Sequence, residues 1–410
     1  MSAHPPLQRF KLTAAFGVAL LALTACGGGD DAPAAAAPTP TVLAFKTLGG
    51  GQPLVVAHRG ASGVLPEHTL EAYIRAIEMG ADFIEPDLVA TKDGVLIARH
   101  EPNITSTTNV ATLPRFASRR TTKKVDGVDE TGWFASDFTL ADIKTLGAVI
   151  TDAERTKVFD GLYKIPTLQE IIDLVKARRT ATGREIGIYP ETKHPTFHRQ
   201  LGLEDRLIAS INAAGWNSKT SPVLVQSFEP GSLKEMHSKG LNTRMVQLID
   251  ADNYDLKTGA LTYAAPYDRP YDWTVSGDTR LFSAMVTPAG LAEIKTYADG
   301  IGPWKPYIVP VKATLDAAGN IVDRNGDGVR NYNDASSQPP TALIDNAHKA
   351  GLIVHAYTFR NEQRRLTFDL NKDPKAEYLL FYRLGLDGLF SDFPDTALEA
   401  RAAYLKELGR

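Results

Sequence analysis

Short β-rich runs alternate with amphipathic helical stretches along most of this 410-residue chain. Repeated β-α units predict a parallel sheet whose strands are joined by right-handed crossovers. No glycine-rich dinucleotide turn appears, and reactive polar residues collect where strands end, so we expect a closed α/β barrel of the TIM (β/α)8 type. The expected strands span 53–60, 82–91, 94–100, 185–193, 222–228, 243–249, 352–359 and 385–393, and the expected helices 68–80, 167–179, 203–214, 229–239, 288–298, 341–350 and 395–408.

The alternation fails in three places. The segment of about 102–162 is predicted to be an insertion rather than a barrel unit, because it contains threonines and a cluster of basic residues (Arg115, Arg119, Arg120, Lys123 and Lys124). Residues 250–290 are rich in aromatic residues and proline, and 301–340 are irregular, so both are predicted to be long loops. A body of 52–410 is long for one average domain but suits a single barrel of ~250 residues with insertions.

Residues 1–25 are predicted to be a signal peptide, since a basic start precedes an apolar run too short for a stable membrane anchor. The run ends in Leu-Thr-Ala-Cys at 23–26, which resembles the lipobox of bacterial lipoproteins, so Cys26 is expected to be lipidated. The alternative is an ordinary cleaved signal with a chance cysteine. Residues 26–51 are rich in Gly, Ala and Pro and predict a flexible tether. We therefore expect export and lipid anchoring in the bacterial envelope, with the outer membrane favoured because Gly27 follows the cysteine.

Charge and cysteine count argue against a nucleic-acid-binding protein and against a fold held by disulfide bonds. A net charge of −3 lacks the basic excess expected of a nucleic-acid-binding surface. Cys26 is the only cysteine, so no intramolecular disulfide can form. Oligomeric state is not indicated by any pattern in the chain.

Two carboxylates interrupt the apolar run of the second expected strand. Residues two apart in a strand point to the same face, so Glu85 and Asp87 point together while Pro86 faces away. Two carboxylates on one face repel unless a cation or a proton joins them. Glu191 and Lys193 repeat the spacing on a later strand, which makes Glu191 a candidate third ligand for a hard cation such as Ca²⁺ or Mg²⁺. The alternatives are a solvated or arginine-paired acid pair and a simple Glu–Lys salt bridge.

Two histidines stand at the ends of expected strands. His58 ends the first and His100 ends the third, and we expect the two rings to converge on one site. Histidine titrates near neutral pH, so one ring can accept a proton while the other donates one. Arg59, next to His58, is suited to bidentate phosphate binding, and Lys193 to contact with a phosphate oxygen. A lone histidine is more often a hydrogen-bonded structural residue, which is the alternative for each.

Several motifs together resemble the glycerophosphodiester phosphodiesterase family, in its longer periplasmic bacterial branch. They are HRGASGVLPEHTLEAY, EPDLVATKDGVLIARHEPNI, YPETK, VHAYTFRNE and DGLFSDFPD, with TGWFASDFTL and YADGIGPWK as further counterparts. The resemblance covers roughly 53–400 in order.

This resemblance implies a TIM barrel with a small inserted domain after the third strand. It implies metal binding by Glu85, Asp87 and Glu191, acid–base roles for His58 and His100, and phosphate contact by Arg59 and Lys193. The implied reaction is metal-dependent hydrolysis of glycerophosphodiesters, such as glycerophosphocholine or glycerophosphoethanolamine, to sn-glycerol 3-phosphate and an alcohol. Attack by water and attack by the glycerol 2-hydroxyl, through a cyclic phosphate, both stay open, as does the order in which the histidines act.

A second cation site is predicted at 323–334. Its spacing matches a calcium-loop template, with ligands expected from Asp323, Asn325, Asp327, Asn331 and Asp334. Such an ion would brace a long loop and would take no part in catalysis. An ordinary Asp/Asn/Gly turn is the alternative.

Other candidates carry weaker signals. Five aromatic residues could line a pocket around the glycerol or the leaving alcohol, although core packing is the commoner fate of such side chains (Trp133, Phe228, Trp273, Trp304 and Tyr357). Asp387 and Asp392, near the last strand, are interpreted as residues that hydrogen-bond a turn.

Two other functions compete with hydrolysis. One is a phospholipase D-like lyase of the same barrel superfamily, acting on lysophospholipid or sphingomyelin with a cyclic phosphate product. The cysteines that commonly bridge catalytic loops in secreted toxins of that kind are missing here. The other is a lipid-anchored surface protein that binds host or cell-wall ligands through a decayed barrel, which the retention of every candidate site residue argues against.

Overall fold

The computed structural model describes residues 44–410, and in this part of the chain eight parallel strands close into a ring. The ring closes because β17 pairs with β1, from Leu54 opposite Gly388 to Ala57 opposite Ser391. The predicted TIM (β/α)8 barrel is therefore confirmed. In ring order the strands are β1 (Leu54–His58), β2 continuing as β3 (Phe83–Glu85, Asp87–Ala90), β7 continuing as β8 (Gly187–Ile188, Glu191–Thr192), β9 (Leu224–Ser227), β10 (Arg244–Ile249), β13 (Gly300–Pro303), β16 (Ile353–Phe359) and β17 (Gly388–Ser391).

A helix follows each ring strand. The helices are α1 (Leu70–Met79), α3 (Leu168–Thr182), α5 (Leu203–Ala214), α6 (Pro230–Ser238), α8 (Pro288–Lys295), α9 (Leu343–Lys349), α10 (Pro374–Leu384) and α11 (Pro394–Glu407). Their ends follow ordinary capping rules: Thr69 accepts a hydrogen bond from the Ala72 amide at the start of α1, and Gly80 ends that helix with φ 112°. Sequence analysis predicted all of them except α10, although Asp373 caps its start and Gly385 its end.

Two strand assignments need correction. The predicted strand at 94–100 is β4 (Leu96–Ala98), which pairs antiparallel with β3 as a hairpin and is not part of the ring. The eighth ring strand is β13, most of which lies in the 301–340 segment that was predicted to be irregular. Its Gly-Ile-Gly-Pro sequence has a weak strand signature, but the ring requires these glycines. A Cβ on Gly300 would lie 2.4 Å from Ile353 Cγ1, and one on Gly302 would lie 2.6 Å from Leu248 Cδ2.

The alternation of side chains along each strand explains how the barrel interior divides into an apolar layer and a polar layer. One cluster of buried apolar side chains contains one residue from each of six ring strands (Val56, Phe83, Tyr189, Leu224, Val246 and Phe390). Because side chains alternate along a strand, the next inward position is two residues further toward the strand's carboxyl end. Those positions are His58, Glu85, Glu191, Gln226, Leu248 and Asp392. Five of these six positions are polar, so polar side chains gather at the carboxyl-terminal mouth of the barrel, next to the apolar layer.

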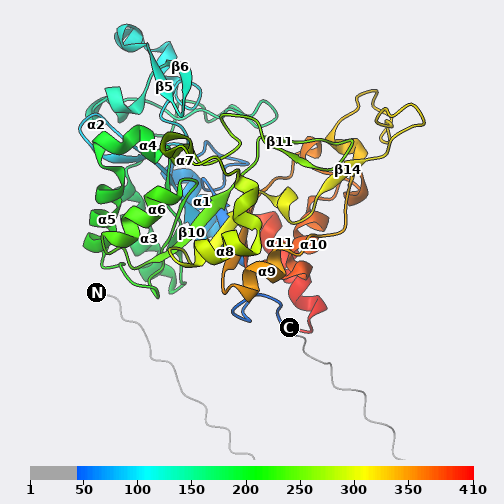
Figure 1. Ribbon diagram of the computed structural model, residues 1–410. Helices are drawn as coiled ribbons and strands as arrows, with labels where there is room; N and C mark the ends of the chain where they lie inside the picture. The colour runs from blue at the N-terminus through cyan, green and yellow to red at the C-terminus, as the bar shows by residue number, and fades with distance from the viewer. Residues whose placement is uncertain (1–43) are drawn as a thin grey trace, which may run out of the picture. The chain divides into compact units, whose positions relative to one another are not determined.

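The predicted insertion between β4 and α3 has a core of its own. Apolar residues of 104–146 form a cluster with side chains of the β3–β4 hairpin (Val89, Ile97, Ile104, Val110, Phe116, Trp133, Phe138, Ile143 and Leu146 among them). Its hairpin, β5 (Thr121–Val125) and β6 (Val128–Gly132), appears in cyan at the top of Figure 1. The insertion follows the third strand in chain order, as expected. Since β4 lies outside the ring, it separates the second and third ring strands.

The predicted signal peptide, Cys26 and most of the predicted tether lie outside the described residues. The described end of the tether is bound to the barrel, because the Leu48 amide donates to Asp387 Oδ1 at 2.7 Å and the Phe45 ring packs 6.3 Å from that of Tyr404. The prediction that the flexible tether extends to residue 51 is therefore wrong for the end of that segment, from Phe45 onward. Within 44–410, no helix is long and apolar enough to cross a membrane.

Candidate active site

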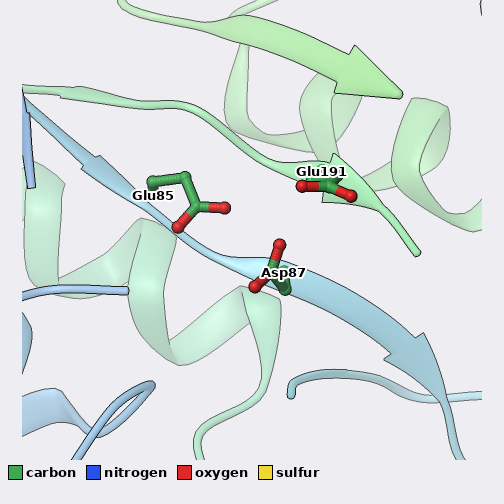
Figure 2. A group of neighbouring side chains, drawn as sticks. All are labelled: Glu85, Asp87 and Glu191. Carbon is green, nitrogen blue, oxygen red and sulfur yellow. The ribbon is translucent and has the colours of Figure 1, made fainter. Parts of the chain in front are cut away.

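Three carboxylates meet at the barrel mouth, as the sequence predicted. Glu85 and Asp87 flank Pro86, where β2 passes into β3, and Asp87 lies opposite Glu191 on β8. Each of the three offers an oxygen within 4.8 Å of the others, and all three side chains are buried. Figure 2 shows Glu85 and Asp87 on one strand facing Glu191 on its neighbour. Within 44–410 this is the one group of three acidic or histidine residues that could hold a metal ion.

The electrostatics of this triad favour a bound cation. Burial, together with the charges of Asp87 and Glu191, raises the pKa of Glu85 well above its usual range. Burial also raises the pKa of Glu191 to about 8, against the opposing effect of Lys193. Burial acts in the same direction on Asp87, but Lys193 and a hydrogen bond from His68 hold the pKa of Asp87 well below its ordinary value. Asp87 Oδ1 is buried without a hydrogen-bond partner, which fits a donor set built for a divalent ion.

Two cations border the triad. The Arg59 amide donates to Glu85 Oε2 at 2.8 Å, and its guanidinium donates to Glu67 Oε2 at 2.9 Å. The backbone of Arg59 is left-handed, with φ 60°, which is uncommon for a residue other than glycine. Lys193 Nζ lies 2.9 Å from Glu191 Oε1 and 3.9 Å from Asp87 Oδ1. Both side chains line the cavity at the mouth, where they can meet a phosphate.

The imidazole of His58 is oriented by an acid at the end of β17. His58 Nδ1 lies 2.6 Å from Asp392 Oδ1, which leaves Nε2 as the nitrogen able to exchange a proton with a ligand. Asp392 also accepts from Arg360 Nε at 2.9 Å and from Arg155 at 2.5 Å. The interpretation of Asp392 as a turn residue was therefore wrong. Burial, with Arg59 adding to it, lowers the pKa of His58 to about 4.

The route by which His100 reaches the mouth differs from the prediction. It does not end a ring strand, because β4 runs back from the hairpin turn toward the level of the triad. The Arg99 amide donates to the Asp87 carbonyl at 2.9 Å, which brings His100 to the rim beside Lys193. His100 Nδ1 lies 2.6 Å from Glu101 Oε1. Burial lowers the pKa of His100, and the charges of Arg59 and Lys193 act in the same direction.

A cavity of about 460 Å³ joins these groups to an aromatic wall. All seven predicted site residues line it (His58, Arg59, Glu85, Asp87, His100, Glu191 and Lys193). Among the aromatic candidates, Phe228, Trp304 and Tyr357 line the cavity, whereas Trp133 is packed in the insertion core and Trp273 in the barrel core. The prediction of an aromatic lining is thus confirmed for three of the five residues.

Sequence reasoning missed several residues that support the site. His68 Nε2 lies 2.9 Å from Asp87 Oδ2, and Glu67 holds Arg59. Both residues stand in the loop before α1, where the alternation of side chains along a strand does not predict which way a side chain points. Position was the one signal for these two residues, since the Glu-His pair stands nine residues after the His-Arg pair at the end of β1. Glu101, Asp126 and His194 were also missed, because their contacts join segments far apart in the chain.

Hydrogen bonds within the chain hold the predicted calcium loop. Asp334 is fully buried and accepts from the amides of Arg324 at 2.8 Å and Asn331 at 2.9 Å. Asp323 accepts from the amides of Gly326 and Gly328. Asn325 donates to Asp327, and Asn331 caps the turn that follows. These are the bonds of an Asp/Asn turn, and calcium at the loop stays a prediction.

Comparison with known proteins finds a matching family and relatives over most of the chain. The glycerophosphoryl diester phosphodiesterase family model matches residues 58–396. A glycerophosphodiester phosphodiesterase of Arabidopsis thaliana is 35% identical over 363 residues, covering 85% of this chain and 86% of the relative. A glycerophosphodiester phosphodiesterase of Haemophilus influenzae is 30% identical over 368 residues, covering 84% and 89% of the two chains.

Solved structures share the fold. A putative glycerophosphoryl diester phosphodiesterase of Silicibacter pomeroyi aligns with a TM-score of 0.55 at 19% identity, covering 89% of this chain and 98% of that one. A phosphodiesterase of Oleispira antarctica, solved with its product sn-glycerol 3-phosphate, aligns with a TM-score of 0.51 at 16% identity, covering 86% and 98%.

Proposed function

We propose, from the premise that this chain belongs to the glycerophosphodiester phosphodiesterase family, that it hydrolyses glycerophosphodiesters to sn-glycerol 3-phosphate and an alcohol at the barrel mouth. The observation that carries the proposal is the convergence of three buried carboxylates, two histidines and two cations on one cavity. Deacylated phospholipids such as glycerophosphocholine and glycerophosphoethanolamine are the proposed substrates.

Each side chain has a role in this proposal. A divalent cation held by Glu85, Asp87 and Glu191 would act as a Lewis acid on a phosphate oxygen. Arg59 and Lys193 hold the phosphate and stabilise the charge that grows on it during attack. We favour Ca²⁺ as the ion because three carboxylates offer hard oxygen ligands, with Mg²⁺ as the alternative.

The two histidines would divide the proton transfers. In each ring Nδ1 is held by a carboxylate, Asp392 for His58 and Glu101 for His100, so each Nε2 is the nitrogen that can meet the substrate. One ring, neutral at Nε2, takes a proton from the attacking water or glycerol 2-hydroxyl. The other ring must be protonated at both nitrogens in the substrate complex, so that its Nε2 gives a proton to the departing alcohol. The wall formed by Phe228, Trp304 and Tyr357 would contact the apolar faces of glycerol or the alcohol.

A phosphorus NMR time course tests the activity. Purified protein with glycerophosphocholine and Ca²⁺ is expected to convert the diester signal into that of sn-glycerol 3-phosphate, and EDTA is expected to stop the conversion. A cyclic phosphate that appears and is then consumed would indicate attack by the 2-hydroxyl. A cyclic phosphate that accumulates as the end product, from lysophospholipid or sphingomyelin, would instead support the lyase. Absence of turnover with every diester would favour a binding protein.

Export and lipid anchoring are proposed from the N-terminal sequence. A basic start, a short apolar run and Leu-Thr-Ala-Cys at 23–26 support cleavage before Cys26 and lipidation of its thiol. Mass spectrometry of the mature N-terminus from a bacterial host is expected to find a diacylglyceryl group on Cys26. An unmodified N-terminal cysteine, or cleavage elsewhere, would reject the anchor.

A further inference from the structure

A chain of hydrogen bonds connects the candidate acid–base residue His100 to the insertion. His100 Nδ1 lies 2.6 Å from Glu101 Oε1, and Glu101 Oε2 lies 2.9 Å from His194 Nε2. His194 Nδ1 lies 2.7 Å from Asp126 Oδ2. The side chains come from three segments: the residues after β4, the residues after β8, and the turn of the β5–β6 hairpin. Nothing in the reaction proposed above requires His194 or Asp126, so their role needs another explanation.

The charge state of His194 follows from its partners. Both ring nitrogens face carboxylate oxygens, which only accept hydrogen bonds when ionised, so both nitrogens must carry hydrogen. His194 is therefore an imidazolium between Glu101 and Asp126. Burial opposes this charge, yet the hydrogen bonds to Asp126 and Glu101 raise the pKa of His194 to about 10. Fixed opposite charges of this kind hold each member of the chain in a single orientation.

The backbone at both ends of the chain is constrained as well. Asp126 has φ 46° because it stands in the two-residue Asp-Gly turn of the β5–β6 hairpin, where left-handed backbone is usual, and His194 has φ 44°, which is uncommon for a residue other than glycine. The hairpin turn also lies against the loop at 250–290, because a Cβ on Gly127 would stand 3.5 Å from Tyr271 Cε2. Asp126 is thus presented to the barrel mouth from a braced position.

We propose that Asp126 and His194 are positioning residues, through which the insertion fixes the ring orientation and tautomer of His100. Asp126 orients His194, His194 orients Glu101, and Glu101 accepts the hydrogen of His100 Nδ1, so that Nε2 is kept free toward the substrate. The proposal rests on the acid–base role of His100 proposed above. The insertion is then part of the active site, although none of its side chains needs to touch the reacting phosphate.

The variant Asp126→Asn tests this proposal with little risk to the fold, since asparagine has the same shape and tolerates left-handed backbone. We expect kcat for glycerophosphocholine to fall about 10-fold, the range seen when residues that orient a site ligand are removed. KM is expected to stay unchanged, because no substrate contact is lost. The matched control is Asp129→Asn on the same hairpin, whose exposed carboxylate pairs with Lys124 and does not line the cavity. This control is expected to keep wild-type kcat.

Two further readouts separate positioning from a general loss of structure. Histidine ¹⁵N NMR should show both ring nitrogens of His194 protonated through neutral pH in the wild type. In Asp126→Asn it should show His100 losing its single Nδ1-H tautomer. The links act in series, so the double variant with His194→Asn should lose no more activity than the worse single variant.

Three outcomes would overturn the proposal. They are wild-type kcat and an unchanged His100 tautomer in Asp126→Asn, a His194 ring that titrates as an ordinary histidine, and fully additive losses in the double variant. A failure here differs from a failure of the proposed function. If His100→Gln is inactive while Asp126→Asn is fully active, only the positioning chain is wrong. If His100→Gln is active, the role of His100 itself is wrong.

Discussion

Replacing either His58 or His100 with glutamine is expected to lower kcat for glycerophosphodiesters by about 10²–10⁴-fold, the usual contribution of a general acid or base. Glutamine fills similar space and can still hydrogen-bond the carboxylate that holds each ring, Asp392 or Glu101. It cannot carry the proton between substrate and solvent. Substrate affinity should change little, because Arg59 and Lys193 still hold the phosphate. Steady-state kinetics with glycerophosphocholine, alongside thermal melting, measures both effects.

The matched control is His237→Gln, on the exposed face of α6 and away from the cavity. His237→Gln should keep full activity, which would show that replacing a histidine elsewhere on the protein does not by itself lower kcat. Near-normal turnover in both His58→Gln and His100→Gln, with the melting temperature preserved, would contradict the assignment of these rings to proton transfer.

Replacing Glu85 of the metal triad with glutamine should change the stability of the protein in opposite directions with and without the metal ion. In the absence of metal, Glu85→Gln is expected to raise the melting temperature, because glutamine mimics the neutral acid that burial and the neighbouring charges favour. With metal, the wild type should be the more stable protein, since Ca²⁺ at 100 times its Kd stabilises by about 2.7 kcal/mol. Loss of a charged ligand should weaken Ca²⁺ binding by at least ~10-fold and abolish most of the activity.

Calorimetric titration with Ca²⁺ and melting curves with and without EDTA test these effects. Glu78→Gln, on the exposed side of α1, is the control and should leave both unchanged. A metal affinity equal to that of the wild type in Glu85→Gln would contradict the triad as the ion site. The same titration on Asp327→Ala examines the loop at 323–334, because loss of one bound ion with activity kept would indicate calcium there, and an unchanged stoichiometry would reject it.

Most ring strands were predictable because they are apolar runs bounded by turn residues, and α5 was predicted with its observed bounds of 203–214. Such patterns identify a strand but not its partners. β4 has the same apolar signature as a ring strand, yet the Asp-Gly turn before it folds it back against β3. The reverse holds for β13, whose glycines weaken its strand signature but are required by close contact with Ile353 and Leu248.

The candidate site divides in the same way. Alternation along a strand placed Glu85 with Asp87, and the repeated spacing on a later strand added Glu191 and Lys193. Neither side-chain alternation nor repeated strand spacing applies to loop residues. The sequence therefore did not show that Glu67 and His68 point toward the site. Asp392 does stand at an inward position after β17, but its pairing with His58 depends on the closure of the ring between β17 and β1.

The sequence by itself determined the barrel class, the acids that share a strand face and the resemblance to a phosphodiesterase family, because these depend on local periodicity and on motif order. Only the tertiary structure decided which strands close the ring, how His100 reaches the mouth and which residues orient the two histidines. Those features depend on contacts between segments tens to hundreds of residues apart, such as His58 with Asp392 and His194 with Asp126. The spacing of residues along the chain does not show which distant segments meet, because these contacts form only when the backbone folds.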